Sequence, residues 1–277
     1  MIKTNLLVLA ISICSLSFIT PNNDKKDPFL KYNKVYYTDK SEEKSGYTVE
    51  LNNIIDYDNE LKFSWKVINT QNDYILIKSN DSKITKLGKE IAVSEKTKLI
   101  APNKSSAQTI KCIGGGENRA KKFSFSSHSI YTLKIDQSSQ KIENVKIPLT
   151  KKDFTFGDVK CNIAVKEKST QSSKIITSIV NNSDQYLFVY PSRIGLKMPD
   201  NNQYASKNNK DLIIIAPKKS KKITCKWDRM PGGRENDMQL VAMDLVFNDV
   251  FYFSQQENME SFVVETSWDE AMTEAKK

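Results

Sequence analysis

The chain has 277 residues, and its 42 Lys and Arg against 33 Asp and Glu give a formal net charge of +9 at pH 7. This length accommodates two domains of ordinary size, and a hydrophobic fraction of 39% is enough for two small cores. One histidine and four cysteines exclude most metal sites that are built on His and Cys side chains.

The first residues have the character of an export signal. Lys3 supplies positive charge, Leu6–Ile13 is a short apolar run, and the small residues of Ser15–Ser17 indicate cleavage after Ser17. The apolar run is too short to span a bilayer, which takes about 20 residues. We therefore expect a signal peptide over residues 1–17, a linker or arm over 18–45, and an exported protein that is periplasmic, associated with the outer membrane, or secreted.

Cys14 leaves a second alternative open for the N-terminus. A cysteine late in a signal sequence can be the lipidated first residue of a bacterial lipoprotein, although Ile13 stands where that motif has Gly, Ala or Ser. Under either alternative the mature chain has no apolar stretch long enough for a transmembrane span.

Two parts of the chain repeat one pattern. Val67–Ile77 matches Ile179–Val189 without a gap, so that Asn69 corresponds to Asn181, and Lys98–Cys112 matches Leu212–Trp227. The repeat is the size of a small domain, far longer than the unit of a solenoid. The sequence therefore predicts two copies of one domain, over residues 46–149 and 150–264.

Short alternating segments follow one another in each copy. In the first copy they are Leu61–Val67, Tyr74–Ile77, Thr109–Ile113, Phe123–Phe125 and Ile130–Ile135. In the second copy, Met238–Phe247 and Val250–Phe253 flank Asn248-Asp249, which predicts a hairpin with a two-residue turn. Short strands with turn residues between them and no long helical period predict an all-β fold of two tandem immunoglobulin-like antiparallel β-sandwiches.

The repeated phrase itself resembles a known module. An apolar residue followed by Ala-Pro-x-x-Ser begins at Ile100 and again at Ile215. It resembles a strand in the middle of many bacterial immunoglobulin-like modules. The resemblance implies architecture and brings no functional residues with it.

The C-terminal tail, residues 265–277, changes character. Ser267 and Glu270 have the spacing of a capping box, which predicts a short helix over Ser267–Lys277. We expect this helix either to pack against the second domain or to dock a partner.

Export makes disulfides permissible. Cys161 and Cys225 both alternate with apolar residues on strands of the second copy, so they either form a disulfide across the sandwich or are buried as small hydrophobes. Cys112 in the first copy has no such partner.

The sequence offers no catalytic or metal-binding set. His128, the single histidine, is expected at an exposed position in a turn or strand, and no nucleophile elbow is present. Asp56, Asp58 and Glu60 are expected in a solvated loop and not in a calcium site, because glycine and ligand spacing are missing. We assign no catalytic residue, no metal and no cofactor.

Two loops and one basic cluster are candidate interaction sites. The loops follow the repeated cysteines and contain Gly115, Gly116, Glu117 and Asn118 in the first copy and Gly232, Gly233, Glu235 and Asn236 in the second. Their recurrence indicates a tight turn, with ligand binding as the alternative. The basic cluster consists of Lys218, Lys219, Lys221 and Lys222, which either protect a strand edge or attract an anionic surface.

These features predict a non-catalytic exported envelope or secreted protein that binds another envelope macromolecule, or serves as an accessory subunit, through its tandem domains. The expected partner is an envelope protein or an anionic surface. Nucleic acid is not expected, because no recognition motif is present.

Two alternative functions stay open. One is a periplasmic chaperone that offers an edge strand, since pilus chaperones are similar in architecture, although their Arg/Lys cleft motif has no match here. The other is glycan binding on Trp65, Trp227 or Trp268, although the first two alternate with core residues.

Overall fold

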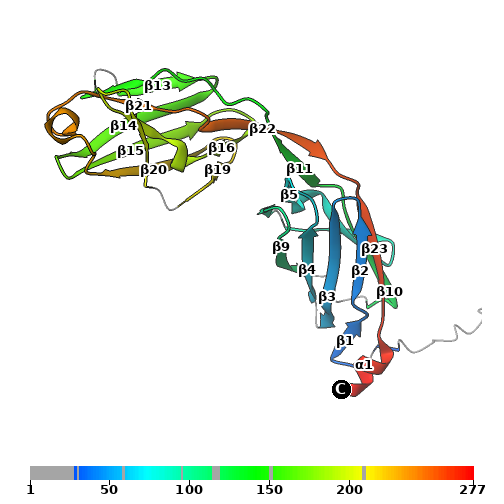
Figure 1. Cartoon of the computed structure of the whole chain (residues 1–277). Helices are drawn as coiled ribbons and strands as arrows, with labels where there is room; N and C mark the ends of the chain where they lie inside the picture. Colours follow the sequence, from blue (N-terminus) through cyan, green and yellow to red (C-terminus); the bar gives the residue numbers. More distant parts are fainter. Residues whose placement is uncertain are drawn as a thin grey trace, which may run out of the picture.

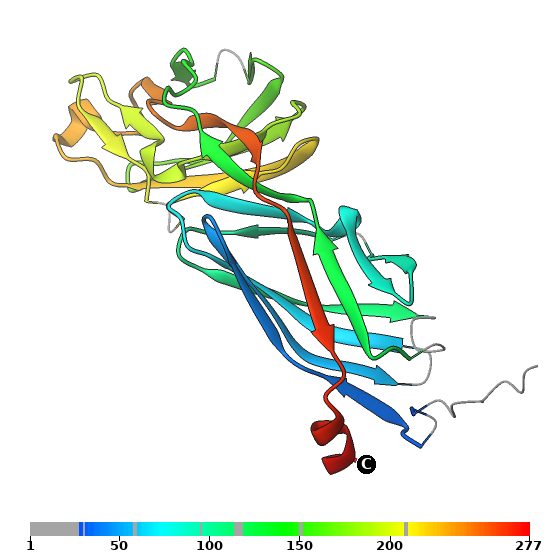
Figure 2. The same cartoon turned by 90° about the vertical axis from the view of Figure 1, so that its right-hand side faces the viewer.

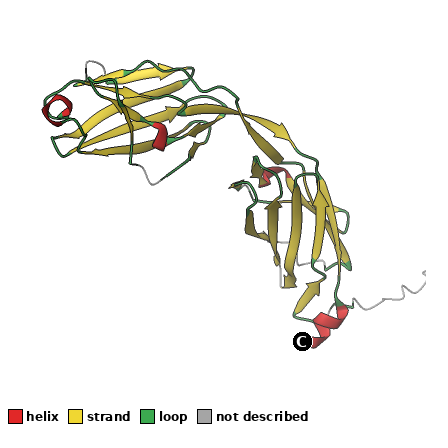
Figure 3. Ribbon diagram, in the orientation of Figure 1, coloured by secondary structure: helices red, strands yellow, loops and turns green. Residues whose placement is uncertain are grey.

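The structure is a computed structural model that describes residues 28–29, 31–57, 60–94, 96–113, 119–149, 152–207 and 210–277. The expected signal peptide, its cleavage after Ser17 and the lipidation of Cys14 lie outside the described residues. The fold is all-β, with several antiparallel sheets packed as sandwiches and a short C-terminal helix, which confirms the predicted class (Figure 3). In the part of the chain that is described, no helix has the length and apolar character needed to cross a membrane.

One sheet of the first sandwich is built on two long strands, β3 (Tyr47–Tyr57) and β4 (Glu60–Asn69) (Figure 1). On their outer sides, β3 pairs with β1 (Lys34–Tyr37) and β2 (Lys40–Lys44), and β4 pairs with β9 (Ser105–Ile113). The expectation of a linker or arm over residues 18–45 is therefore wrong for β1 and β2, because Val35 and Tyr37 are buried in the first core. Burial alternates along β4, as the sequence predicts, so that every second side chain enters the core.

The opposing layer of the first sandwich consists of shorter strands. β10 (Lys122–Ser127) pairs with β6 (Ser82–Lys86) and with β23 (Phe262–Ser267), and β7 (Lys89–Ala92) pairs with β6. Beside them, β5 (Tyr74–Lys78) pairs with β8 (Thr97–Ile100) and β11 (Ile130–Ile135).

The second sandwich repeats this plan. Its long sheet has the order β13 (Asp153–Phe156), β14 (Val159–Lys168), β15 (Ser172–Asn181), β20 (Lys219–Asp228). A second sheet has the order β12 (Val145–Ile147), β21 (Met243–Val246), β17 (Gly195–Lys197), β18 (Gln203–Ala205). Finally, β16 (Tyr186–Val189) pairs with β19 (Ile213–Ile215) and β22 (Phe251–Asn258).

Two buried asparagines at equivalent positions of the repeats make equivalent hydrogen bonds. The Nδ2 group of Asn69 donates to the carbonyl oxygens of Asp73, Ile100 and Ala101, at 2.7, 3.3 and 3.1 Å. The Nδ2 group of Asn181 donates to the carbonyl oxygens of Gln185, Ile215 and Ala216, at 2.8, 3.2 and 3.3 Å. Each asparagine therefore ties the end of its own strand to the next turn and to the repeated Ile-Ala-Pro phrase, because buried carbonyl groups require a donor.

The two sandwiches share one six-stranded sheet, of order β19-β16-β22-β11-β5-β8. Strands β11 and β22 pair at its centre and connect the two halves of the molecule (Figures 1 and 2). On one face of this sheet, Leu76, Leu133 and Phe188 are fully buried, and the rings of Tyr74 and Phe188 lie 5.5 Å apart. This third apolar cluster joins the sandwiches, because it combines side chains from both repeats.

The repeats also exchange their last strands. β12 follows β11 along the chain but pairs with β21 in the second sandwich. β23 follows β22 but pairs with β10 in the first sandwich, as the strand that runs back along it in Figure 2. β11 and β22 are equivalent strands of the two repeats, since Ile130 lies opposite Ile77 of β5 as Phe251 lies opposite Val189 of β16. Their own pairing is symmetric, because Lys134 lies opposite its equivalent, Gln255. Each sandwich is thus completed by a strand from the other repeat.

This exchange corrects two expectations about the division of the chain. β12, expected in the first domain, contributes Ile147 to the second core, and β23 contributes Phe262 and Val264 to the first core. The expected hairpin around Asn248-Asp249 is also wrong, because β21 and β22 lie in different sheets. A strand that follows a turn need not pair with the strand before it. The core in which its apolar side chains are buried determines which sheet it joins.

The two described ends of the chain meet at the tip of the first sandwich. The helix α1 (Glu270–Ala275) begins after Asp269, whose side chain accepts from the backbone amide of Met272 at 2.8 Å. Asp269 is therefore the N-cap, and not Ser267, which ends β23. Trp268 packs edge-on against Phe29, with ring centroids 4.9 Å apart, so the tail packs on the first sandwich and not on the second.

Candidate functional site

The outer strand β20 carries the most distinctive surface of the second sandwich. Its alternation buries Ile223, Cys225 and Trp227, and the indole Nε1 of Trp227 donates to the Tyr204 carbonyl oxygen at 2.9 Å. The intervening side chains, including Lys222 and Lys226, are therefore directed away from the core. The buried residues hold β20 in place against the core, and the position of β20 determines where its lysines lie.

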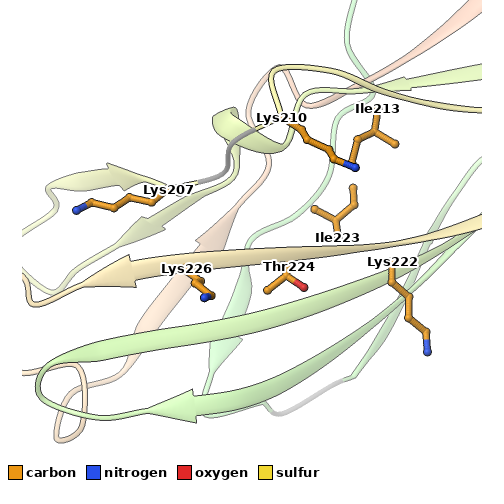
Figure 4. A pocket seen from close by; sticks show the side chains of 7 residues that line it. All are labelled: Lys207, Lys210, Ile213, Lys222, Ile223, Thr224 and Lys226. Atoms are coloured by element: carbon orange, nitrogen blue, oxygen red, sulfur yellow. The ribbon is translucent and has the colours of Figure 1, made fainter.

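A groove of about 320 Å³ follows this strand. The backbone amide of Lys207 donates to the Lys226 carbonyl oxygen at 2.8 Å, which holds the segment before β19 alongside β20. Figure 4 shows Lys210 and Ile213 on one side of the groove and Ile223 pointing toward them from β20. Four lysines line the groove together with these isoleucines: Lys207, Lys210, Lys222 and Lys226. In Figure 4 the Lys210 side chain extends toward Ile213, whereas those of Lys207 and Lys222 point away from it.

The rim carries more positive charge than its neighbours neutralise. Lys207 pairs with Asp228 at 2.5 Å. In the described part of the chain, Lys222 and Lys226 have no ion pair, and neither has Lys174, which lies directly beside Lys226 on β15. Uncompensated lysines on one strand edge create a local positive potential that attracts anionic groups.

The corresponding face of the first sandwich is different. There Lys66 pairs with Glu50 at 3.1 Å, and Lys111 pairs with Glu60 at 3.5 Å. Two copies of one fold therefore differ in electrostatics at equivalent strands. The lysine groove is a property of the second repeat and is not required by the architecture.

The predicted basic cluster contributes to this surface only in part. Lys218 lies in the turn before β20 with φ of +58°, and its Nζ pairs with Asp184 at 3.0 Å. Lys219, Lys221 and Lys222 are exposed on β20. The sequence did not indicate Lys207 or Lys210, because they come from a separate irregular segment, whereas the alternation of β20 did place Lys226 on the solvent face.

The glycine loop of the second copy has a structural basis. Gly232 has φ of +104°, and a Cβ there would lie 2.4 Å from the Nδ2 atom of Asn236. Asn236 is buried and donates to the Asp200 carboxylate at 2.6 Å and to the Pro231 carbonyl oxygen at 2.9 Å. The loop thus closes over its own asparagine, while Gly233 and Glu235 are exposed. The loop of the first copy, Gly115–Asn118, lies outside the described residues.

The three described cysteines are free and buried. The alternative of a Cys161–Cys225 disulfide is wrong, because β14 and β20 lie in the same sheet with β15 between them. Burial raises the pKa of Cys112 and Cys225 to about 11 and that of Cys161 to about 12. The thiols are therefore core residues without nucleophilic character at neutral pH.

The acidic cluster holds a buried ion pair. Asp56 is fully buried at the end of β3, where its carboxylate pairs with the buried Lys86 ammonium group. The hydroxyl of Tyr37 lies 3.4 Å from the same carboxylate oxygen and donates to the Ala120 carbonyl oxygen at 2.8 Å. Asp56 is therefore not in a solvated loop as expected, and Asp58 lies outside the described residues.

Other predicted site residues are accounted for by the fold. His128 is exposed between β10 and β11. Trp65 and Trp227 are 1% and 2% exposed, so neither can present a ring face to a glycan. In the described part of the chain, no group of three or more His, Cys, Asp and Glu side chains could hold a metal ion.

Comparison with known proteins assigns no family. No protein-family model and no curated protein matches the sequence. Among solved structures, the chain is similar to a red sea bream transglutaminase, with 8% identity and a TM-score of 0.20, over 83% of this chain and 31% of that one. The chain thus spans under a third of the length of that enzyme, and a similarity of this size carries no argument about activity.

Proposed function

We propose that this protein is a non-catalytic, exported binding protein whose second sandwich holds an anionic envelope macromolecule at the lysine groove. The observation that supports the proposal is that Lys207, Lys210, Lys222 and Lys226 line one groove. On the equivalent face of the other repeat, Lys66 and Lys111 are paired with Glu50 and Glu60. Such a difference between two copies of one fold indicates a local role for the charge.

The composition of the groove indicates how a partner is held. Exposed ammonium groups accelerate encounter and select for negative charge, but each contributes little binding energy in water. Ile213 is half-buried and adds apolar surface to the groove, whereas Ile223 belongs to the core beside it. A partner that combines carboxylate or phosphate groups with apolar groups fits this surface best.

Binding is tested with poly-L-glutamate and with vesicles that contain an anionic lipid, over a range of salt concentrations. The double variant Lys222→Glu, Lys226→Glu is expected to weaken binding at least tenfold at low salt and to flatten its salt dependence. The control variant Lys89→Glu, Lys98→Glu has the same net charge, with both substitutions on exposed lysines of the first sandwich. Equal losses in both variants would show that only net charge matters and would overturn the proposal.

The edge of β20 favours one alternative, a chaperone-like protein that pairs this strand with an extended segment of its partner. The Lys226 carbonyl oxygen accepts from the backbone amide of Lys207, which is not part of β15. Because the direction of backbone groups alternates along a strand, the backbone groups of the even-numbered residues of β20 face away from β15. Among the described residues, nothing pairs with the outward groups of Ser220 and Lys222. Under this alternative, acidic peptides of strand-forming sequence bind, whereas vesicles and unstructured poly-L-glutamate do not.

A further inference from the structure

The strand equivalent to β20 in the first sandwich is β9, and it too lies at the edge of its sheet, beside β4 (Figure 1). The backbone amide of Asn69 donates to the Lys104 carbonyl oxygen at 2.8 Å, in register with the ladder of β4 and β9. Even-numbered residues of β9 therefore bond to β4. The amide and carbonyl groups of Ser105, Ala107, Thr109, Lys111 and Ile113 face away from the sheet.

These outward groups form an unprotected edge. Among the described residues, no backbone group pairs with them. Proteins commonly protect such edges with charged side chains, above all lysine. β20 carries Lys219, Lys221, Lys222 and Lys226, whereas β9 carries Lys111 alone, and its charge is balanced by Glu60 at 3.5 Å.

The sequence of β9 is compatible with pairing to itself. In an antiparallel pair with a two-fold axis at Thr109, the two Thr109 residues face each other. Ala107 then faces Lys111, and Ser105 faces Ile113, so no like charges are opposed. The same operation on β20 would place Lys222 opposite Lys222, which is unfavourable.

We propose that β9 is a self-association surface, at which two copies of this chain join their long sheets by antiparallel pairing of β9 with β9. Two-fold symmetry makes such a contact closed, so it yields a dimer and not a filament. The interior of the dimer sheet has the order β3-β4-β9-β9-β4-β3. The lysine grooves belong to the second sandwiches and are not part of this contact. This inference is independent of the proposed function, since it rests on a different strand of the other repeat.

The experiment is analytical ultracentrifugation of the mature chain, from residue 18 onward, at concentrations from about 1 to about 100 µM, a range that covers weak to moderate homodimers. Thr109→Lys is expected to weaken the dimer at least tenfold, because it opposes two lysines on the two-fold axis. Thr155→Lys is the matched control, since it makes the same change at an exposed threonine on β13 and should leave the dimer unchanged.

Hydrogen exchange gives a second reading that does not depend on a variant. Protection of the outward amides of Ser105–Ile113 should rise with protein concentration, while that of Lys219–Asp228 should not. A wild-type chain that stays monomeric throughout, or a dimer that Thr109→Lys leaves intact, would overturn the inference. A thermal melt of Thr109→Lys that matches the wild type excludes misfolding as the cause of a loss.

Discussion

Phe262 gives a direct test of the strand exchange. It lies on β23, more than a hundred residues after the other strands of the first core, yet it is 1% exposed and packs against Trp65 and Phe125. Its ring centroid is 6.0 Å from that of Trp65 and 5.6 Å from that of Phe125. Phe262→Ala removes a buried aromatic side chain and leaves a cavity, so we expect a loss of about 3–5 kcal/mol in unfolding free energy.

The assay combines urea unfolding with hydrogen exchange followed by mass spectrometry. Because Phe262 belongs to the first core, protection should fall in β4 and β10 and should hold in β15 and β20. Val263→Ala is the matched control, since Val263 is the next residue and is 59% exposed, and it should cost less than about 0.5 kcal/mol. A loss below about 1 kcal/mol for Phe262→Ala, or a loss of protection confined to β15 and β20, would refute the exchange.

Three further predictions follow from the buried polar groups and thiols. Asn69→Ala and Asn181→Ala each remove three hydrogen bonds to backbone carbonyls and should each cost about 3 kcal/mol by urea unfolding, whereas Asn182→Ala at an exposed position should cost little. Lys86→Met leaves the Asp56 carboxylate buried without its partner and should cost about 3–5 kcal/mol. Burial already raises the pKa of Asp56, so the variant should lose stability as pH rises above about 4, and Asp56→Asn in addition should remove that pH dependence. Finally, peptide mapping after treatment with a thiol reagent at pH 8 should find Cys112, Cys161 and Cys225 unmodified in the native protein and modified in urea, and rapid native modification would contradict their burial.

Local patterns in the sequence predicted the repeat and many of the strands, but not β1 and β2, which lie in the expected linker over residues 18–45. The alternation in Leu61–Val67 and in Ile223–Trp227 reports which side chains face a core, and this is a local property that tertiary packing preserved. The matched asparagines, Asn69 and Asn181, make matched hydrogen bonds, so the similarity of the two segments was structural and not accidental.

Pairing between strands was not predictable in the same way. β12 and β23 have the composition of strands, but nothing within a strand specifies which copy of a repeated sandwich it completes. That choice depends on how β11 and β22 pair at the centre of the molecule, which is a long-range property. The same limit explains why a Cys161–Cys225 disulfide stayed open as an alternative, since alternation shows that a cysteine faces inward but not which sheet its strand occupies.

The lysine groove combines both kinds of information. Lys222 and Lys226 follow from the alternation of β20, whereas Lys207 and Lys210 belong to a segment without a regular period. Only the three-dimensional structure brings the two sets together. It also shows that Lys66 and Lys111 of the first sandwich are paired with carboxylates. This difference in ion pairing between the two sandwiches is the reason for proposing a binding site at the groove.

Lysine footprinting tests the binding surface most directly. The protein is acetylated briefly with and without saturating poly-L-glutamate, and modification at each lysine is quantified by mass spectrometry. We predict strong protection of Lys207, Lys222 and Lys226, and little protection of Lys89 and Lys98 on the first sandwich. Equal protection of both groups, or protection confined to the first sandwich, would contradict a binding site at β20.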